Sequence, residues 1–317
     1  MRVVLIASGE FALPTLAALH TDPTVDIPLV VTSPDRPGGR GRRLLPTPVK
    51  TRAAAMGIPV VDVEDINEPD VIKRARECRA TVGLVIAFGQ KIRVPFRGVF
   101  SGGCVNLHAS LLPKYRGAAP FQWAIIRGET ETGVTVFHLV DRMDAGPILA
   151  TRRTTIGESE TSSELHDRLA ELGPDAVRDV LDQFDGGAVP AGRPQDDSLA
   201  TRAPKFTKQD GRIGFDRTAA EVVAWINGLW SWPGATCRYV SVDGQRQERV
   251  TLARARRGDG VATGEPGAVD SGGRIHALDG TVALMELKPE GGRVMEWRAF
   301  VNGRTVQAGD HFERITE

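Results

Sequence analysis

Hydrophobic and polar positions alternate along the first 150 residues in a way that predicts strands separated by helices. Runs rich in β-branched residues indicate strands, and segments of helical composition lie between them. The expected strands are Arg2–Ala7, Val25–Thr32, Ile58–Asp62, Thr81–Ala87 and Cys104–His108, and the expected helices are Phe11–His20, Pro48–Met56 and Asn67–Arg79. This order predicts a doubly wound, mostly parallel, Rossmann-like α/β sheet that is covered on both faces.

The pattern changes towards the middle of the chain. Gly133–Val140 and Ile148–Thr155 predict a β-hairpin joined by Asp141–Pro147, and Glu160–Phe184 predicts a long helix interrupted near Gly173-Pro174. Asp185–Pro204 has no clear periodicity and is rich in Gly and Pro, which indicates a linker. We therefore expect domains at residues 1–184 and 205–317, joined by a linker at 185–204.

The C-terminal part predicts a small, mostly β domain. One amphipathic helix at Thr218–Gly228 precedes short alternating runs that are separated by Asp-Gly turns. Such strands are typical of a small β-barrel or sandwich. The runs are Ala235–Val240, Arg249–Ala253, Arg274–Ala277 and Val282–Leu287.

Composition limits the classes of protein that fit. The 317 residues include 40 basic and 40 acidic residues, and 41% are hydrophobic, which excludes global disorder and a basic coat over the whole chain. The cysteines Cys78, Cys104 and Cys237 are far apart, which argues against a disulfide framework and a metal site. No apolar run approaches the ~18 residues of a membrane span. Without a secretory or transit signal, a cytoplasmic protein with no membrane partner is expected.

The loop after the first strand lacks a nucleotide-binding fingerprint. Ala7-Ser8-Gly9-Glu10-Phe11 matches neither G-x-G-x-x-G nor G-x-x-x-x-G-K-[ST]. A nicotinamide dehydrogenase and a P-loop NTPase are therefore disfavoured despite the doubly wound pattern.

The segment Asn106–Pro120 concentrates the residues that can carry chemistry. Asn106 and His108 lie two apart on a strand, so they point to one face, and the strand then enters a loop at the carboxyl edge of the sheet. An Asn amide can donate to a developing oxyanion, and an imidazole can donate as well or move a proton. Asp144 is the best candidate for a third group that orients His108. No nucleophile elbow surrounds Ser110, which favours direct transfer to an external nucleophile.

From residue types alone, other interpretations stay open. An Asn-x-His pair on a strand is often a satisfied hydrogen-bonding pair, and an Asp before a turn, such as Asp144, is often a turn residue.

The same residues closely resemble the signature of the 10-formyltetrahydrofolate-dependent formyltransferase family. That signature is Asn-x-His-x-Ser-x-Leu-Pro, then Arg-Gly, with an Asp-x-Gly hairpin farther along the chain. The resemblance implies that Asn106, His108 and Asp144 are catalytic and that 10-formyltetrahydrofolate is the formyl donor, with no metal. It also implies that folate contacts come from Ser110, Leu111, Leu112, Pro113, Phe88 and Gly89, although core packing is an equal alternative for Phe88.

Two positions depart from the family pattern. The family usually has Gly-Thr-Pro-x-Phe where this chain has Ala7-Ser8-Gly9-Glu10-Phe11, and Thr where this chain has Ala145. The first departure bears on the acceptor pocket, and the second removes a hydroxyl beside Asp144.

A basic segment narrows the choice of acceptor among a tRNA, glycinamide ribonucleotide, an amino-sugar nucleotide and water. Arg36–Arg52 holds six basic residues and no acidic one, in a Gly- and Pro-rich segment too irregular for a helix. Such a loop suits a phosphate backbone, although a solvated basic loop is the alternative. It resembles the insertion that the tRNA-formylating branch of the family places at the acceptor stem. The expected tRNA contacts are Arg36, Arg40, Arg42, Arg43, Lys50, Lys205 and Lys208.

Charge in the C-terminal part is unevenly distributed. Residues 202–257 hold eleven basic and five acidic residues, whereas residues 258–317 hold six basic and ten acidic residues. This favours one basic face for tRNA. Lys205–Ile213 and Trp230–Ala235 resemble the family's domain junction and its OB-like C-terminal barrel. For Trp230 and Trp232, packing is favoured over stacking on bases.

The resemblance as a whole implies a monomeric transferase that formylates methionyl-initiator-tRNA for translation initiation. Two alternatives stay open. One is a member of the family that acts on a sugar nucleotide or hydrolyses the folate, and the other is a non-catalytic tRNA-binding relative.

Overall fold

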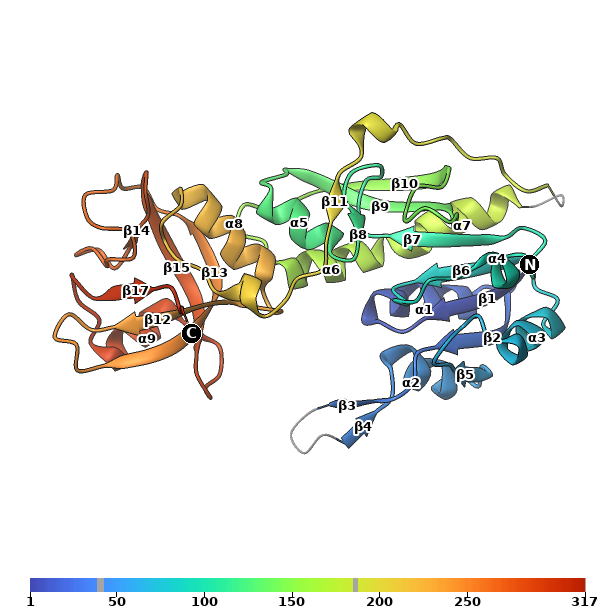
Figure 1. Cartoon of the computed structure of the whole chain (residues 1–317), viewed down its shortest axis with the longest axis horizontal. Helices are drawn as coiled ribbons and strands as arrows, with labels where there is room; N and C mark the ends of the chain where they lie inside the picture. The colour runs from blue at the N-terminus through green and yellow to red at the C-terminus, as the bar shows by residue number, and fades with distance from the viewer. Residues whose placement is uncertain (39–42, 185–187, 317) are drawn as a thin grey trace. The chain divides into compact units, whose positions relative to one another are not determined.

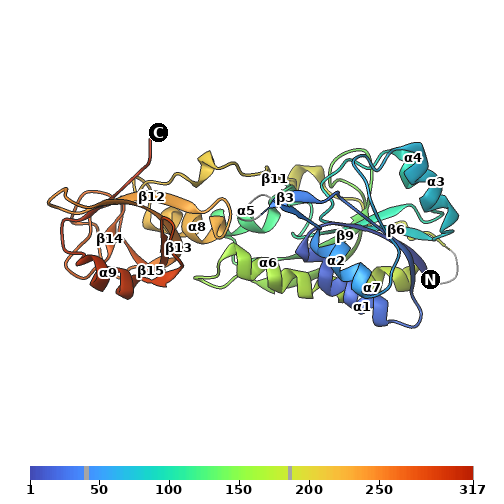
Figure 2. The ribbon, with the colours of Figure 1, turned by 90° about the horizontal axis from the view of Figure 1, so that it is seen from below.

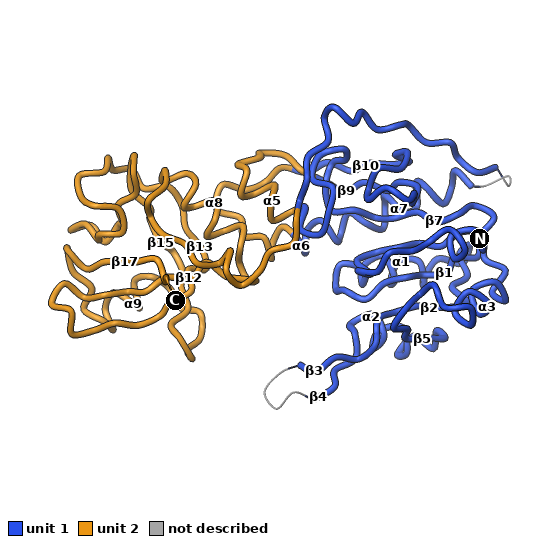
Figure 3. Tube along the Cα trace, in the orientation of Figure 1, with its two compact units in different colours: residues 1–120, 133–154, 166–203 blue, residues 121–132, 155–165, 204–317 orange. Residues whose placement is uncertain are grey.

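The computed structural model describes residues 1–38, 43–184 and 188–316 of the chain (Figure 1). These residues form two compact units, which are coloured separately in Figure 3. Unit 1 comprises Met1–Pro120, Gly133–Thr154 and His166–Ala203, and unit 2 comprises Phe121–Thr132, Thr155–Leu165 and Pro204–Glu317. Two short segments from within residues 1–184 therefore belong to unit 2. The expected domain boundaries stay a prediction.

Unit 1 is built on a seven-stranded sheet with the strand order β10-β9-β7-β6-β1-β2-β5. The pairs β1–β2, β1–β6, β2–β5 and β6–β7 are parallel, and β9 is antiparallel to β7. The strands are β1 (Arg2–Ala7), β2 (Asp26–Thr32), β5 (Val60–Asp62), β6 (Val82–Ile86), β7 (Cys104–His108), β9 (Glu131–His138) and β10 (Ile148–Thr155). The expected Rossmann-like, mostly parallel sheet is confirmed.

Helices cover both faces of this sheet (Figure 2). On one face lie α1 (Leu13–Thr21), which follows the 3-10 turn η1 (Glu10–Ala12), α2 (Pro48–Ala55) and α7 (Gly173–Gln183). On the other lie α3 (Pro69–Glu77) and α4 (Val94–Arg97). Proline in the first turn of these helices fits a position whose N–H would have no partner within the helix.

The expected interruption at Gly173-Pro174 is confirmed, because α6 (Ser162–Glu171) ends where α7 begins. Close packing explains why position 173 is a glycine. A Cβ there would lie 2.7 Å from Thr15 Oγ1 and 2.8 Å from Leu107 Cδ2. Glycine therefore lets the start of α7 approach both α1 and β7.

The basic segment after β2 differs from the expected irregular loop. It contains two short antiparallel strands, β3 (Arg36–Gly38) and β4 (Arg43–Leu45). Leu44 and Leu45 on β4 are 67% and 50% exposed. The structure also contains helix α5 (Pro120–Ile126), which periodicity did not predict.

The core of unit 1 contains the thiol of Cys104 at the start of β7, 2% exposed. Burial raises the pKa of this thiol from 9.0 to about 12. The folded chain therefore holds the neutral thiol. Since the thiol of the unfolded chain ionises first, the stability that the buried Cys104 thiol contributes falls as the pH rises from 9.0 towards 12.

We expect Cys104 to resist thiol-modifying reagents in the native chain at about pH 8, because the thiolate is the reactive form. Mass spectrometry after labelling with and without denaturant measures this, and denaturation should make the residue reactive. Rapid labelling of Cys104 in the folded chain would contradict the assignment.

Unit 2 contains an antiparallel sheet with the order β14-β15-β13-β12-β17, and β16 pairs with β15. Bridges from Ala268 to His311 and from Val269 to Ile275 connect one short segment to both edge strands, which nearly closes the sheet. The expected C-terminal barrel is confirmed. Its strands are β12 (Ala235–Val240), β13 (Gln247–Arg257), β14 (Ile275–His276), β15 (Thr281–Pro289), β16 (Met295–Glu296) and β17 (His311–Glu313).

Helices α8 (Ala219–Leu229) and α9 (Trp297–Arg304) contact strands of the barrel. Thr218 and Glu221 form a capping box that starts α8, as the Thr-x-x-Glu sequence allows.

Trp123 on α5 stacks on Phe206 with ring centres 4.7 Å apart. The expectation of packing is wrong for Trp232, which is 48% exposed.

The segment expected to be a linker makes ordered contacts within unit 1. Arg193 and Ile148 exchange backbone hydrogen bonds of 2.7 and 2.8 Å, and β11 (Arg202–Ala203) pairs in parallel with β8 (Arg116–Gly117). In Figure 1 this segment passes above β10 before it reaches β11. Among the described residues, no helix has the length and apolar character needed to cross a bilayer.

Candidate active site

Strand β7 brings Asn106 and His108 to the carboxyl edge of the sheet. Asn106 pairs with Val85 on β6 and with Phe137 on β9, and His108 pairs with Thr135 on β9. His108 is buried and Asn106 is half-buried. The sheet therefore fixes the backbone of both residues, and their side chains share one face.

His108 lies between a backbone carbonyl and a carboxylate. Its Nε2 is 2.9 Å from the carbonyl oxygen of Tyr115, and its Nδ1 is 3.9 Å from Oδ2 of Asp144. A carbonyl can only accept a hydrogen bond, so this contact places a proton on Nε2. Nδ1 is then the ring nitrogen that faces Asp144. The structure thus brings His108 of β7 and Asp144 of a separate loop together.

Asp144 lies in the loop between β9 and β10 and has a left-handed backbone with a φ of 51°. Its Oδ2 accepts a hydrogen bond of 2.8 Å from the N–H of Gly117. The side chains of His108 and Asp144 are 8% and 13% exposed, so little water competes for their interaction. Two residues on, Gly146 permits the turn, because a Cβ there would lie 1.7 Å from the carbonyl oxygen of His138.

The loop after His108 is held by internal hydrogen bonds. Ser110 Oγ donates to the carbonyl of Lys114 at 2.7 Å, and Thr135 Oγ1 donates to the carbonyl of Ser110 at 2.6 Å. The same Thr135 Oγ1 accepts from the N–H of Leu112 at 3.1 Å. The buried hydroxyl of Ser110 is therefore used to shape the loop. Leu111 and Pro113 are half-buried on the same loop, and a folate contact by any of them stays a prediction.

The loop after β6 contains the other expected folate residues. The side chain of Phe88 is 5% exposed and belongs to the core cluster that includes Ile92 and Phe96, which favours core packing, and a folate contact by Phe88 stays a prediction. Gly89 is exposed and has a φ of +82°, a conformation that favours glycine. In the loop after β1, Gly9 lies close to Ala87, since a Cβ on Gly9 would be 3.3 Å from Ala87 Cβ.

The residues expected to contact tRNA have different surroundings. Arg36, Arg43, Lys205 and Lys208 are exposed. Lys50 already bonds Asp35 at 2.7 Å and Asp62 at 3.0 Å, and these bonds raise the pKa of its ammonium group. A phosphate would compete with two carboxylates for that lysine. The remaining two, Arg40 and Arg42, lie outside the described residues.

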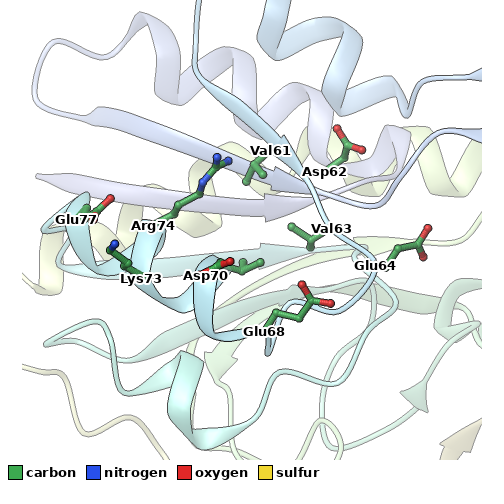
Figure 4. A pocket seen from close by; sticks show the side chains of 10 residues that line it. Val61, Asp62, Val63, Glu64, Glu68, Asp70, Lys73, Arg74 and Glu77 are labelled. Atoms are coloured by element: carbon green, nitrogen blue, oxygen red, sulfur yellow. The ribbon is translucent and has the colours of Figure 1, made fainter.

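A surface hollow of about 450 Å³ lies beside β5 and α3 (Figure 4). Its polar lining is mainly acidic and includes Glu64, Glu68 and Asp70. In the sheet order, β6, β1 and β2 separate β5 from β7. This hollow is therefore apart from His108 and Asp144. Among the described residues, no group of His, Cys, Asp and Glu side chains could hold a metal ion.

Two polar residues that the sequence did not single out support the site. Gln195 donates from its amide nitrogen to the carbonyls of Asp144 and Gly146, at 2.9 and 2.8 Å. Its amide oxygen accepts from Nε and Nη2 of Arg116, at 3.1 and 2.7 Å. Arg116 also bonds Asp197 at 2.9 Å. The Arg-Gly of the family signature pointed to Arg116, but no local pattern marks Gln195 or Asp197.

Comparison with known proteins identifies the family. A family model described as formyl transferase matches residues 1–181, and the model of the formyl transferase C-terminal domain matches residues 205–305. This chain belongs to the formyl transferase family. The match places Asn106, His108 and Asp144 of this formyl transferase within the N-terminal model.

Curated relatives resemble this formyl transferase along nearly its whole length. A methionyl-tRNA formyltransferase of Pelobacter propionicus is 39% identical over 311 residues, covering 97% of this chain and 94% of the relative. One from Sorangium cellulosum is 38% identical over 314 residues, covering 98% of each. One from Geobacter metallireducens is 36% identical over 313 residues, covering 98% of this chain and 97% of the relative.

Solved structures share the fold of this formyl transferase at lower identity. HypX from Aquifex aeolicus in complex with tetrahydrofolic acid is 17% identical with a TM-score of 0.61, and the match covers 97% of this chain and 48% of HypX. An N-formyltransferase from Helicobacter canadensis is 16% identical with a TM-score of 0.64, and the match covers 89% and 98% of the two chains. At this level of sequence identity, these matches show a shared fold alone.

Proposed function

We propose that this formyl transferase moves the formyl group of 10-formyltetrahydrofolate to the amino group of methionyl-initiator-tRNA. One observation carries the proposal. Relatives named methionyl-tRNA formyltransferase are 36–39% identical over 97–98% of the chain, including the C-terminal domain. The product primes translation, and tRNA and folate are the two substrates.

In the proposed reaction the amine attacks the formyl carbon, and a tetrahedral intermediate with an oxyanion forms. The Asn106 amide donates a hydrogen bond to that oxyanion. His108 donates the second one from Nδ1 in the form that carries a proton on both ring nitrogens, while its Nε2 stays bonded to the Tyr115 carbonyl and the Asp144 carboxylate balances its charge. The intermediate then collapses, and the bond between the formyl carbon and N10 of the folate breaks. The nitrogen of methionine loses one proton and N10 gains one, so the transfer needs no oxidant or reductant.

Asp144 has two tasks in this proposal. Its carboxylate faces Nδ1 of His108 at 3.9 Å and orients the ring towards the reacting carbon. The same carboxylate assists removal of the proton from the attacking nitrogen. The Ser110–Pro113 loop and the exposed glycine at position 89 border this edge of the sheet, and we propose that they hold the folate.

The direct test is a formyl transfer assay with labelled 10-formyltetrahydrofolate. The acceptors are methionyl-initiator-tRNA, uncharged tRNA, free methionine and no acceptor. Formylation of the charged tRNA alone is the expected result. Release of formate without dependence on tRNA would contradict the proposal and would indicate a folate hydrolase instead.

The exposed arginines of the β3–β4 hairpin provide a second test. Replacing Arg36 and Arg43 by alanine removes two charges that suit phosphates, so the tRNA KM should rise. The dependence of log affinity on log salt should flatten by about 0.9 for each phosphate that the variant no longer neutralises. Fluorescence anisotropy with labelled tRNA over a salt series measures this slope.

A matched control removes the same charge elsewhere on unit 1. Lys73 and Arg76 are exposed on α3, and their double alanine variant should keep the wild-type salt slope. Equal slopes for both double variants would count against a role of the hairpin in tRNA binding.

A further inference from the structure

Asp144 is held in place by residues outside the three proposed catalytic ones. Its left-handed backbone is an uncommon conformation for a residue other than glycine, so surrounding contacts must maintain it. Two contacts act on it directly. The N–H of Gly117 bonds its carboxylate at 2.8 Å, and the amide nitrogen of Gln195 bonds its carbonyl at 2.9 Å.

Gln195 connects the two loops that meet at the site. The amide nitrogen bonds both Asp144 and Gly146 in the β9–β10 loop, and the amide oxygen bonds two nitrogens of Arg116. The Arg116 side chain is 12% exposed, so this junction is shielded from water. The Gln195 side chain thus fixes the backbone around Asp144 relative to the loop of Arg116 and Gly117. The N–H of Gly117 in that loop donates to the Asp144 carboxylate.

Neighbouring residues strengthen the same junction. Asp197 bonds Arg116 at 2.9 Å and also pairs with Arg142 in the β9–β10 loop. These arginines lower the pKa of the Asp197 carboxyl to about 2, so it stays charged near neutral pH. Farther along, Ala203 pairs with Gly117, and a Cβ on Gly117 would lie 2.5 Å from the Ala203 carbonyl oxygen. The segment from 195 to 203 therefore contains Gln195, which bonds the Asp144 carbonyl, and it also pairs with Gly117, which bonds the Asp144 carboxylate.

We propose that Gln195 is a positioning residue for the reaction, which sets the place of the Asp144 carboxylate beside His108 through its two amide donors. This inference rests on the proposed function, since it assumes that Asp144 takes part in formyl transfer. The segment from 190 to 203 then does more than connect two domains, because it carries a residue that the chemistry needs. Displacing the loop by about 1 Å is enough to lower a rate substantially.

Two substitutions separate the contacts of Gln195. Gln195→Ala removes all of them, whereas Gln195→Glu keeps an acceptor for Arg116 but loses both donors to the carbonyls of the Asp144 loop. Each is expected to lower kcat about 10- to 100-fold with little change in the KM for folate or tRNA. Ser198→Ala is the control, because among the residues that the structure describes the Ser198 hydroxyl on the same segment bonds only Asp196.

A double-mutant cycle with Asp144→Asn tests whether Gln195 acts through Asp144. Asparagine keeps the backbone carbonyl that Gln195 bonds, but it has no carboxylate to position. Single-turnover rates with enzyme in excess should therefore show less than about a twofold effect of Gln195→Ala in that background. Thermal unfolding of every variant checks folding, and if Gln195→Ala does not fold, Gln195→Glu completes the cycle.

The possible results distinguish a failure of the positioning role from a failure of the proposed function. Equal losses in both backgrounds, a change in KM alone, or wild-type kcat in Gln195→Glu would overturn the positioning role and leave Asp144 catalytic. An Asp144→Asn variant with wild-type kcat would overturn the role of Asp144 and the role of Gln195 with it. A large loss in the wild-type background that disappears in Asp144→Asn supports the positioning role.

Discussion

Replacement of Asn106 by alanine is expected to lower kcat about 10²–10³-fold, the typical effect of losing one oxyanion donor. Asn106 lies between β6 and β9 in the sheet, so its backbone stays in place when the side chain is shortened. The affinity for tRNA should stay close to that of the wild type, because the amide acts on the transition state. Initial rates of formyl transfer, together with tRNA binding by anisotropy, measure the two quantities separately.

A suitable control for that variant is Asn302→Ala, since Asn302 is an exposed residue on α9. It should keep wild-type kcat and wild-type binding. Two results would sink the assignment of Asn106 as an oxyanion donor. One is a kcat within a few-fold of wild type, and the other is a large loss of tRNA affinity.

Replacement of Asp144 by asparagine is expected to lower kcat about 10²–10⁴-fold, the range of general acid–base contributions. Asparagine has nearly the same shape and still offers an oxygen to the N–H of Gly117, which the carboxylate bonds at 2.8 Å. The loss then reports the missing charge beside Nδ1 of His108. Measurements of kcat and KM, together with thermal unfolding, distinguish this effect from a loss of folding.

Asp141→Asn provides a matched control from the same loop. Asp141 is exposed and pairs with Arg97 at 2.6 Å, so its charge does not face His108. Its kcat should remain within about twofold of wild type. If Asp141→Asn and Asp144→Asn lose activity equally, the effect belongs to the loop as a whole, and the special role of the Asp144 carboxylate is refuted.

The structure refines how far a charge count predicts tRNA contacts. Arg36 and Arg43 are exposed as expected, but Lys50 has two acidic partners that are far from it in sequence. The two carboxylates therefore reduce the positive charge that Lys50 presents to a phosphate. A run of basic residues indicates a surface that attracts phosphates. Whether each basic side chain is free to bind one depends on acidic partners that lie outside the run.

The sequence by itself determined the features that arise from local order. Periodicity of two in β7 put Asn106 and His108 on one face, alternation of strands and helices predicted the parallel sheet, and Gly173-Pro174 marked the break between α6 and α7. The signature also singled out Asp144, because an Asp-x-Gly turn is a local motif. These predictions succeed because backbone geometry repeats over a few residues, and the side-chain pattern follows it.

Tertiary structure alone decided how the catalytic candidates are supported. Gln195 bonds Asp144 across 51 positions and Arg116 across 79 positions, and it lies in a segment with the composition of a linker. No periodicity or motif relates residues so far apart, since their contact depends on how the segment folds back over β10 and β8. The same holds for Phe88, whose side chain is used by the core. Local patterns therefore identify the reacting groups, while long-range hydrogen bonds and packing set their positions.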